Sequence, residues 1–292
     1  MKKVPDTTHF ASYQFLHYKV TSELAKTETN PNFKKILQKF AQHEWNDFKF
    51  WKQFSSRQKF AISPLTIIGL KILRKVLGLT FLVKYLEKQE KELISRYTDF
   101  LTKVQDDKLK IKIKEAIAHE TKHEEELIAQ IKEERVEFIS SIILGINDGL
   151  IELTGALVGF SFALQNHFFI ALTGFITGIA ASLSMASSAY MQAQYEHGKN
   201  AKKAAFYTGS AYFIIVLLLV LPFLITSSII LSLGLLLSVV LIVITSLSFY
   251  TSIIFERNFK HQCLQMILFT MGVAMITFLI GLALRSILGL EV

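Results

Sequence analysis

The stretch GINDGLIELTGALVG, residues 145–159, lies within an apolar run at roughly 138–164. At about 1.5 Å per residue, a helix of this run is long enough to cross a hydrocarbon layer of about 30 Å. The run nevertheless contains two carboxylates, Asp148 and Glu152, which are four residues apart and therefore share one face of a helix. An ionised carboxylate in hydrocarbon costs about 2.5–3.5 kcal/mol or more. These acids must therefore face protein, water or a cation.

Four further apolar runs follow, at roughly 168–191, 205–225, 229–255 and 263–289. Each is long enough to span a membrane as a helix. The last three are rich in Leu, Ile, Val and Phe, and we expect them to face lipid. We therefore predict a five-helix transmembrane domain in residues 136–292.

The residues before this domain have a different composition. Residues 1–135 contain 26 of the 32 Lys and Arg residues and 18 of the 24 Asp and Glu residues, and they account for the whole net charge of +8. The lysines are scattered along helical patterns, which favours attraction to an anionic membrane face over binding of nucleic acid. We predict that residues 1–135 form a separate, soluble domain.

The connections between the apolar runs indicate an orientation. Those at 195–203 and 256–262 carry five Lys and Arg residues, whereas those at 165–167 and 226–228 carry none. Positive charge is enriched on the cytosolic side of membrane proteins. We expect a multi-pass protein of the cell membrane, with its N-terminal domain in the cytosol and its C-terminus on the opposite side.

No lysine or arginine is expected at the depth in the membrane at which Asp148 and Glu152 lie. Their neutralising partner is then a proton, a metal ion, or each in turn, and the alternative is a protonated pair hydrogen-bonded between helices. Met185 lies in the second run, on a serine-rich stretch. Its thioether is a soft ligand for transition metals, although methionine in a span also serves as ordinary packing.

Two stretches together, residues 145–159 and GFITGIAASLSMASSAY at 174–190, resemble the first two spans of the vacuolar iron transporter family. The resemblance implies that Asp148 and Met185 line a metal path between the two subunits of a homodimer. It also implies that ferrous iron or manganese leaves the cytosol in exchange for protons. Where the family usually has Gly-Glu-Tyr, this chain has Ser188-Ala189-Tyr190, and Glu152 is our candidate for the missing carboxylate.

In residues 1–135, hydrophobic periodicity predicts helices at about 8–28, 32–56, 80–104 and 108–135, which suggests a four-helix bundle. The connector at 63–79 is apolar with three cationic residues and is short for a span. It is either a helix at the membrane interface or a crossover packed on the bundle.

The second pair of helices carries a ligand pattern. Glu87 and Glu90 are three residues apart, and Glu120 and His123 form a Glu-x-x-His motif one helix later. This arrangement points carboxylate and imidazole groups into a bundle core, where they bind paired iron ions. The alternative is a solvated charged face.

This part of the chain resembles the rubrerythrin and ferritin-like superfamily, and its order before a transporter-like domain is similar to that of membrane-bound ferritins. The first helix pair departs from the family pattern, because Glu44 is followed by Asp47 rather than by histidine. Reflection through the turn predicts Gln14 or His17 opposite Glu44. We therefore expect an asymmetric metal site with a complete second half and an altered first half of Glu44, Asp47 and His17.

These observations predict an all-α protein with a ferritin-like four-helix bundle and five transmembrane helices. Three functions are consistent with the sequence. The first is export of Fe²⁺ or Mn²⁺, with the bundle capturing the ion. The second is a membrane-anchored di-iron ferroxidase or peroxidase, and the third is a transporter regulated by metal sensing in the bundle.

Overall fold

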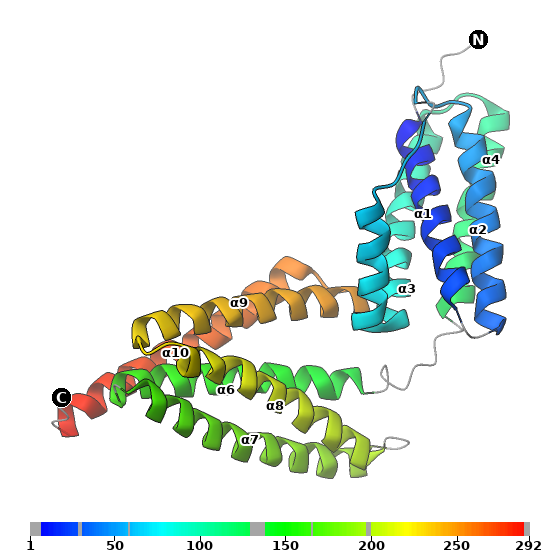
Figure 1. Cartoon of the computed structure of the whole chain (residues 1–292). Coiled ribbons are helices and arrows are strands. Elements are labelled where there is room, and N and C mark those ends of the chain that lie inside the picture. The colour runs from blue at the N-terminus through cyan, green and yellow to red at the C-terminus, as the bar shows by residue number, and fades with distance from the viewer. Residues whose placement is uncertain are drawn as a thin grey trace. The chain divides into compact units, whose positions relative to one another are not determined.

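The computed structural model of the 292-residue chain describes residues 7–28, 31–57, 59–128, 138–164, 166–196 and 200–288. Every regular element in these ranges is an α-helix (Figure 1), which confirms the all-α prediction for this part of the chain. The chain divides into two compact units, Met1–Lys132 and Glu133–Val292, which we call the bundle unit and the membrane unit.

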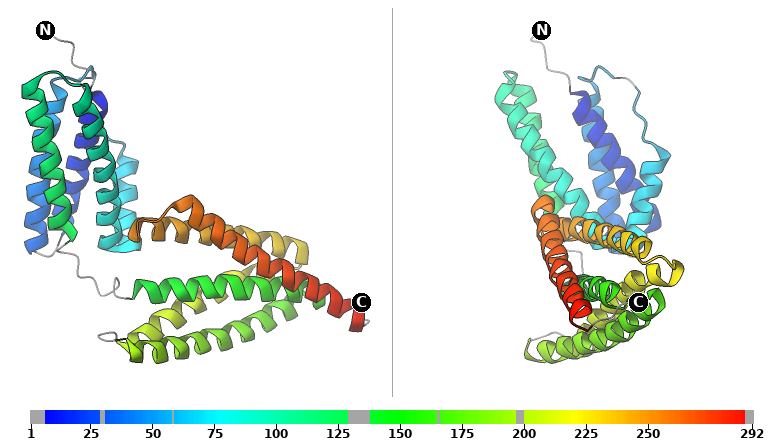
Figure 2. Two further views of the ribbon diagram at one scale, coloured as in Figure 1. Left: turned by 180° about the vertical axis from the view of Figure 1, so that it is seen from behind. Right: turned by 90° about the vertical axis from the view of Figure 1, so that its left-hand side faces the viewer.

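In its described residues, the bundle unit contains four helices packed side by side as two hairpins (Figure 2). Their bounds are α1 Thr8–Thr27, α2 Pro31–Lys52, α3 Pro64–Lys103 and α4 Asp107–Ile128. Helix α2 ends at Lys52, four residues before the predicted position 56. The predicted extension of the last helix beyond residue 128 lies outside the described residues.

Helix α3 includes most of the predicted connector 63–79, and it is two helical segments joined at a kink. The kink is at Gly78, whose φ of 87° and ψ of 171° are accessible to glycine and strained for other residues. Leu65, Ile68 and Ile72 lie in the first segment, share one face by their spacing, and are exposed. Their exposure does not fit a crossover packed on the bundle.

Two apolar clusters form the core of the bundle unit. The aromatic cluster is built mainly from rings and includes Phe10, Phe48, Trp51, Leu93, Tyr97 and Ile113. The leucine-rich cluster lies at the other end of α1, α2 and α3 and includes Val20, Leu24, Leu37, Phe40, Leu82 and Leu86. Five buried polar residues lie between the two clusters in sequence: Gln14, His17, Glu44, Glu87 and Glu90.

Within the residues that the structure describes, the membrane unit has five helices, each long and apolar enough to cross a membrane. They are α6 Ile139–Ala163, α7 His167–Tyr195, α8 Ala201–Ile225, α9 Ile229–Ile254 and α10 Phe259–Leu288. The prediction of five spans is confirmed, and the chain has the helices of a multi-pass membrane protein.

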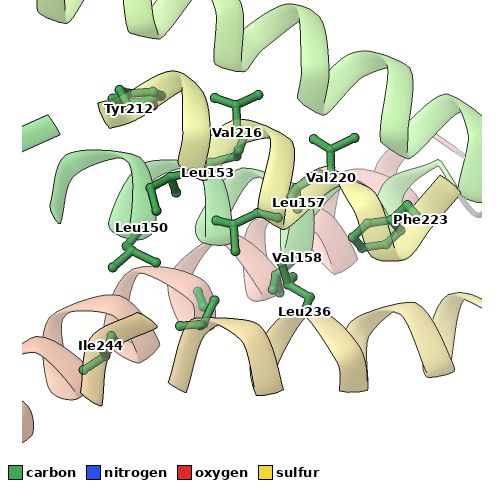
Figure 3. Close-up of a cluster of buried hydrophobic side chains, with 14 of the residues drawn as sticks. Leu150, Leu153, Leu157, Val158, Tyr212, Val216, Val220, Phe223, Leu236 and Ile244 are labelled. Carbon is green, nitrogen blue, oxygen red and sulfur yellow. The ribbon is translucent and has the colours of Figure 1, made fainter. Parts of the chain in front are cut away.

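Helix α6 is the centre of the membrane unit, because it contacts each of the other four helices. Its leucines at 150, 153 and 157 pack against side chains of α8, such as Val216, and of α9, such as Leu236 (Figure 3). Leu150, Leu153 and Leu157 lie at spacings of three and four residues, so one face of α6 supplies this core.

Glycines allow α6 to approach its neighbours closely within one chain. A Cβ atom added at Gly281 of α10 would lie 2.6 Å from the carbonyl oxygen of Gly159 of α6. Close by, the Thr277 hydroxyl donates a hydrogen bond of 2.7 Å to the carbonyl oxygen of Gly155. The glycine pattern of the first span is therefore explained by packing between helices.

One expectation for the membrane unit is wrong. Because spans three to five are rich in Leu, Ile, Val and Phe, we expected all three to face lipid. The third span, α8, is instead the most buried of the five, with 50% of its apolar window buried, compared with 44% for α6 and 28% for α7. Composition alone does not separate a lipid-facing helix from one that packs against protein.

Candidate metal sites

A layer of buried polar side chains crosses the bundle unit between its two apolar clusters. Each helix contributes one member: His17 from α1, Glu44 from α2, Glu90 from α3 and Glu120 from α4, all of them 5% exposed or less. On α3 the sequence shows why, since Leu86, Glu90 and Leu93 follow at spacings of four and three on one face. Packing Leu86 and Leu93 into the core therefore also buries Glu90 between them. We call these four residues the polar layer.

Three members of the polar layer converge. The Nδ1 atom of His17 lies 3.8 Å from Oε1 of Glu44 and 3.8 Å from Oε1 of Glu90. One ligand atom from each of the three residues lies within 4.8 Å of the others. Ligand atoms around an ion bound at about 2.1 Å are at most about 4.2 Å apart. Small side-chain movements would therefore bring these three atoms onto one divalent cation.

The electrostatics of Glu44 favour a cation at this place. Burial raises the pKa of Glu44 well above its usual value, and the nearby carboxylates of Glu120, Glu90 and Asp47 raise it further. Its Oε2 atom is buried and accepts no hydrogen bond from any described residue. Among the described side chains, no lysine or arginine forms an ion pair with it. A bound cation would supply the missing positive charge.

The ring of His17 is held from two sides. Its Nε2 atom lies 3.4 Å from the amide oxygen of Gln89, and the ring of Tyr13 stacks on it at 4.2 Å with an angle of 22°. When the proton is on Nε2 and faces Gln89, the lone pair of Nδ1 faces the two glutamates, as a metal ligand requires. Sequence analysis did not identify Gln89 or Tyr13, because their roles depend on contacts between helices.

The fourth member, Glu120, has a different partner. The Nε2 atom of Gln14 donates hydrogen bonds to Oε1 of Glu120, at 3.0 Å, and to the hydroxyl of Tyr97, at 3.1 Å. The sequence left Gln14 and His17 as alternatives opposite Glu44. The structure buries both and places them differently, with His17 at the acid pair and Gln14 at Glu120.

The remaining predicted ligands of the bundle are not part of the convergent group. Glu87 is buried, but its carboxylate forms ion pairs with Lys84, at 2.8 Å, and Lys91, at 2.9 Å. Asp47 is half-buried and acts on Glu44 through its charge. The side chain of His123 lies outside the described residues, so its ligand role stays a prediction.

The membrane unit holds the second candidate site. Asp148 and Glu152 are the tenth and fourteenth residues of α6, about 14 and about 20 Å along the helix from Ile139. Asp148 is half-buried and Glu152 is exposed in the single chain. The hydroxyl of Tyr212, a buried residue of α8, donates a hydrogen bond of 2.9 Å to Oε2 of Glu152. Sequence analysis missed Tyr212 because it lies in a span that looked lipid-facing.

Neither intramembrane acid forms an ion pair with a lysine or arginine among the residues that the structure describes. Met185 of α7 is half-buried and packs against the apolar core of the membrane unit. Its role as a ligand beside Asp148 stays a prediction. As the sequence indicated, Asp148 and Glu152 therefore lie deep in a span without a basic partner among the described residues.

Comparison with known proteins bears on the membrane unit. The model of the VIT family, the vacuolar iron transporter family that the first two spans resemble, matches residues 139–198. This match covers α6 and α7 and includes Asp148, Glu152 and Met185. No curated protein and no solved structure matches the chain. The resemblance of these two spans is confirmed, whereas the ferritin-like resemblance of the bundle unit stays a prediction.

Proposed function

We propose that this protein transports divalent iron or manganese out of the cytosol, and that Asp148, Glu152 and Met185 line the path. The observation that carries the proposal is the pair of carboxylates deep in α6, which lack a basic partner among the described residues. The VIT family match to the same helix supports a metal ion as the cargo. Carboxylate oxygens with a thioether sulfur suit first-row divalent ions.

Protons are the exchange partner in this proposal. A carboxylate deep in a membrane is neutral either when it is protonated or when it binds a cation, so a site of two acids can release protons as it takes up a metal ion. The Tyr212 hydroxyl supports this cycle by holding Glu152 in a fixed position while its partner changes. Coupling of metal export to proton entry follows from this exchange.

A homodimer would complete the path. Glu152 is exposed on the surface of a single chain, where hydrocarbon would surround it. The cost of about 2.5–3.5 kcal/mol for such an acid favours covering it with protein. We infer that the face of α6 bearing Asp148 and Glu152 meets the same face of a second copy, so that both pairs of acids line one path.

The bundle unit is proposed to be the cytosolic domain that captures the ion before transport. The convergence of His17, Glu44 and Glu90 supports this role. The exposed face of Leu65, Ile68 and Ile72 supports attachment to the membrane, since the same segment carries Lys and Arg residues that suit an anionic surface. The distribution of positive charge in the loops favours an orientation with this unit in the cytosol, and we propose the cell membrane as the location.

Transport by reconstituted protein tests the central proposal. We expect proteoliposomes containing the unsubstituted protein to take up Mn²⁺ or Fe²⁺ when an opposing pH gradient is imposed. Asp148→Asn keeps the size of the side chain and removes its charge, so we expect uptake to fall to the level of empty liposomes.

The matched control is Glu256→Gln, which also removes one acid from the membrane unit but does so in the connection between α9 and α10. Uptake by this variant should equal that of the unsubstituted protein. If Asp148→Asn transports as fast as Glu256→Gln, the intramembrane acids do not carry the ion and the proposal is wrong.

A further inference from the structure

We propose that the polar layer binds one metal ion per chain, through His17, Glu44 and Glu90, and that Gln14 prevents a second ion from binding at Glu120. This inference rests on the capture role proposed above for the bundle unit. It differs from the paired-iron site that the Glu-x-x-His pattern predicted.

The three ligands match one divalent cation in charge and in position. Two carboxylates supply two negative charges, and a neutral imidazole supplies a third ligand atom. The Nδ1 atom of His17 is 3.8 Å from an oxygen of each glutamate. One ion would neutralise both acids in a place where burial makes an uncompensated charge costly.

A second ion would need further carboxylates, and two other acids in this part of the bundle are buried, Glu87 and Glu120. The first is already neutralised by Lys84 and Lys91, whose Nζ atoms lie 2.8 and 2.9 Å from its two oxygens. An ion bound to Glu87 would lie beside two ammonium groups. Glu87 therefore binds two lysines of the bundle unit rather than a second metal ion.

Glu120 faces an amide instead of an ion. A carboxylate oxygen accepts hydrogen bonds, so the group of Gln14 that faces it at 3.0 Å must be the NH₂ group. The same nitrogen is 3.1 Å from the hydroxyl of Tyr97, which fixes the position of the side chain. An amide nitrogen is not a metal ligand, and turning the buried Oε1 atom of Gln14 toward Glu120 in its place would break both of these hydrogen bonds.

A single ion has a chemical consequence. One ion held by two carboxylates and one imidazole suits capture and release of a divalent metal. A reaction that needs two irons side by side would also need a second set of ligands around Glu120, where the Gln14 amide occupies the place of one ligand. The single-ion site therefore favours capture over the di-iron enzyme considered from the sequence.

The number of ions can be counted in the full-length protein. In the Asp148→Asn, Glu152→Gln background, which disables the intramembrane acids, equilibrium dialysis against Mn²⁺ followed by metal analysis should give one ion per chain. The electron paramagnetic resonance spectrum should be that of isolated Mn²⁺. Two ions, or a spin-coupled pair, would overturn the single-ion inference. No bound ion would remove the capture role itself, and it would leave the transport assay as the separate test of the membrane unit.

The ligands are tested by a matched pair on α3. Glu90→Gln and Glu87→Gln remove the same charge from two buried positions three residues apart. We expect the Mn²⁺ affinity to fall by about a hundredfold for Glu90→Gln and to stay unchanged for Glu87→Gln. Equal losses in the two variants, or a loss at Glu87 alone, would overturn the assignment.

The role of Gln14 is tested by giving Glu120 a ligand as its neighbour. Gln14→Glu adds a carboxylate, and Gln14→His adds a neutral ligand in case a further buried acid prevents folding. Either folded variant should bind two ions. Folding can be checked by tryptophan fluorescence, because both tryptophans of the chain, Trp45 and Trp51, are in the bundle unit. A folded variant that still binds one ion would show that Gln14 is not the barrier.

Discussion

The crossing of α6 and α10 offers a test of the packing that positions the intramembrane acids. We consider Gly281→Ala, which adds one methyl group where α10 meets the backbone of α6. The new Cβ would lie 2.6 Å from the carbonyl oxygen of Gly159, and ordinary contact begins at 3.4 Å, so the helices must separate by about 0.8 Å. The atom that is met is backbone and has no rotamer by which to move away.

The cost follows from this geometry. Adding a methyl group to a well-packed core costs about 1–3 kcal/mol. Alanine is favoured over glycine in a helix by about 0.5–1 kcal/mol, which offsets part of this cost. Gly272→Ala provides the matched control, because it makes the same change on the same helix with nothing within 4 Å of the added atom. The difference between the two variants isolates the clash, about 1–3 kcal/mol.

Thermal unfolding in detergent measures the difference. For a unit of this size each kcal/mol shifts Tm by about 2–4 °C, so we expect Gly281→Ala to unfold about 2–12 °C below Gly272→Ala by circular dichroism. Tryptophan fluorescence reports on Trp45 and Trp51 in the bundle unit and should be the same in both variants. Equal melting temperatures would refute the close crossing of α6 and α10.

Two further predictions concern the candidate sites. Tyr212→Phe keeps the ring and removes the hydrogen bond to Glu152. An intramembrane hydrogen bond contributes about 0.6–1.5 kcal/mol, so metal uptake should fall roughly three- to tenfold. The control variant Tyr207→Phe should transport normally. The raised pKa of Glu44 means that the folded, ion-free bundle binds more protons than the unfolded chain above about pH 4.5, so its stability should fall as pH rises above that value. Urea unfolding followed by tryptophan fluorescence should show this slope in the presence of a chelator, and either Glu44→Gln or saturating Mn²⁺ should reduce it.

Much of the fold could be predicted from periodicity. The four bundle helices were expected close to their observed bounds because of their hydrophobic periodicity, and the five spans because each is an apolar run long enough to cross a membrane. The first segment of α3 was harder to assign. Its exposed Leu65, Ile68 and Ile72 have helical spacing, but the break at Gly78 depends on one residue with positive φ. A lone glycine in an apolar run is not a distinctive signal.

The candidate sites were predictable in composition and less so in pairing. The sequence placed Glu90 among the ligands by its spacing to Glu87, Glu44 by the ferritin-like pattern, and His17 by reflection of Glu44 through the turn. It could not separate Glu90 from Glu87, because two acids three residues apart lie on nearly the same face. Lys84 and Lys91, about one turn before and after Glu87, form ion pairs with it and so distinguish it from Glu90. These ion pairs can be recognised only in the structure.

Contacts between distant helices account for the rest. Tyr212 is 60 residues from Glu152, and Gln14 is 106 residues from Glu120. A single sequence contains no information on such pairs unless the topology is known in detail. The hydroxyl of Tyr212 was therefore overlooked among the leucines of its span, although it is the group that contacts one of the two acids.

The position of α6 limits how a transport cycle can proceed. This helix carries both acids and contacts every other helix of the membrane unit. A large displacement of α6 would disturb four interfaces at once, whereas α9 is mostly exposed and has its smallest interface with α6. In the proposed transport cycle, α6 would therefore stay in place while less closely packed helices move to open the acids first to one side of the membrane and then to the other.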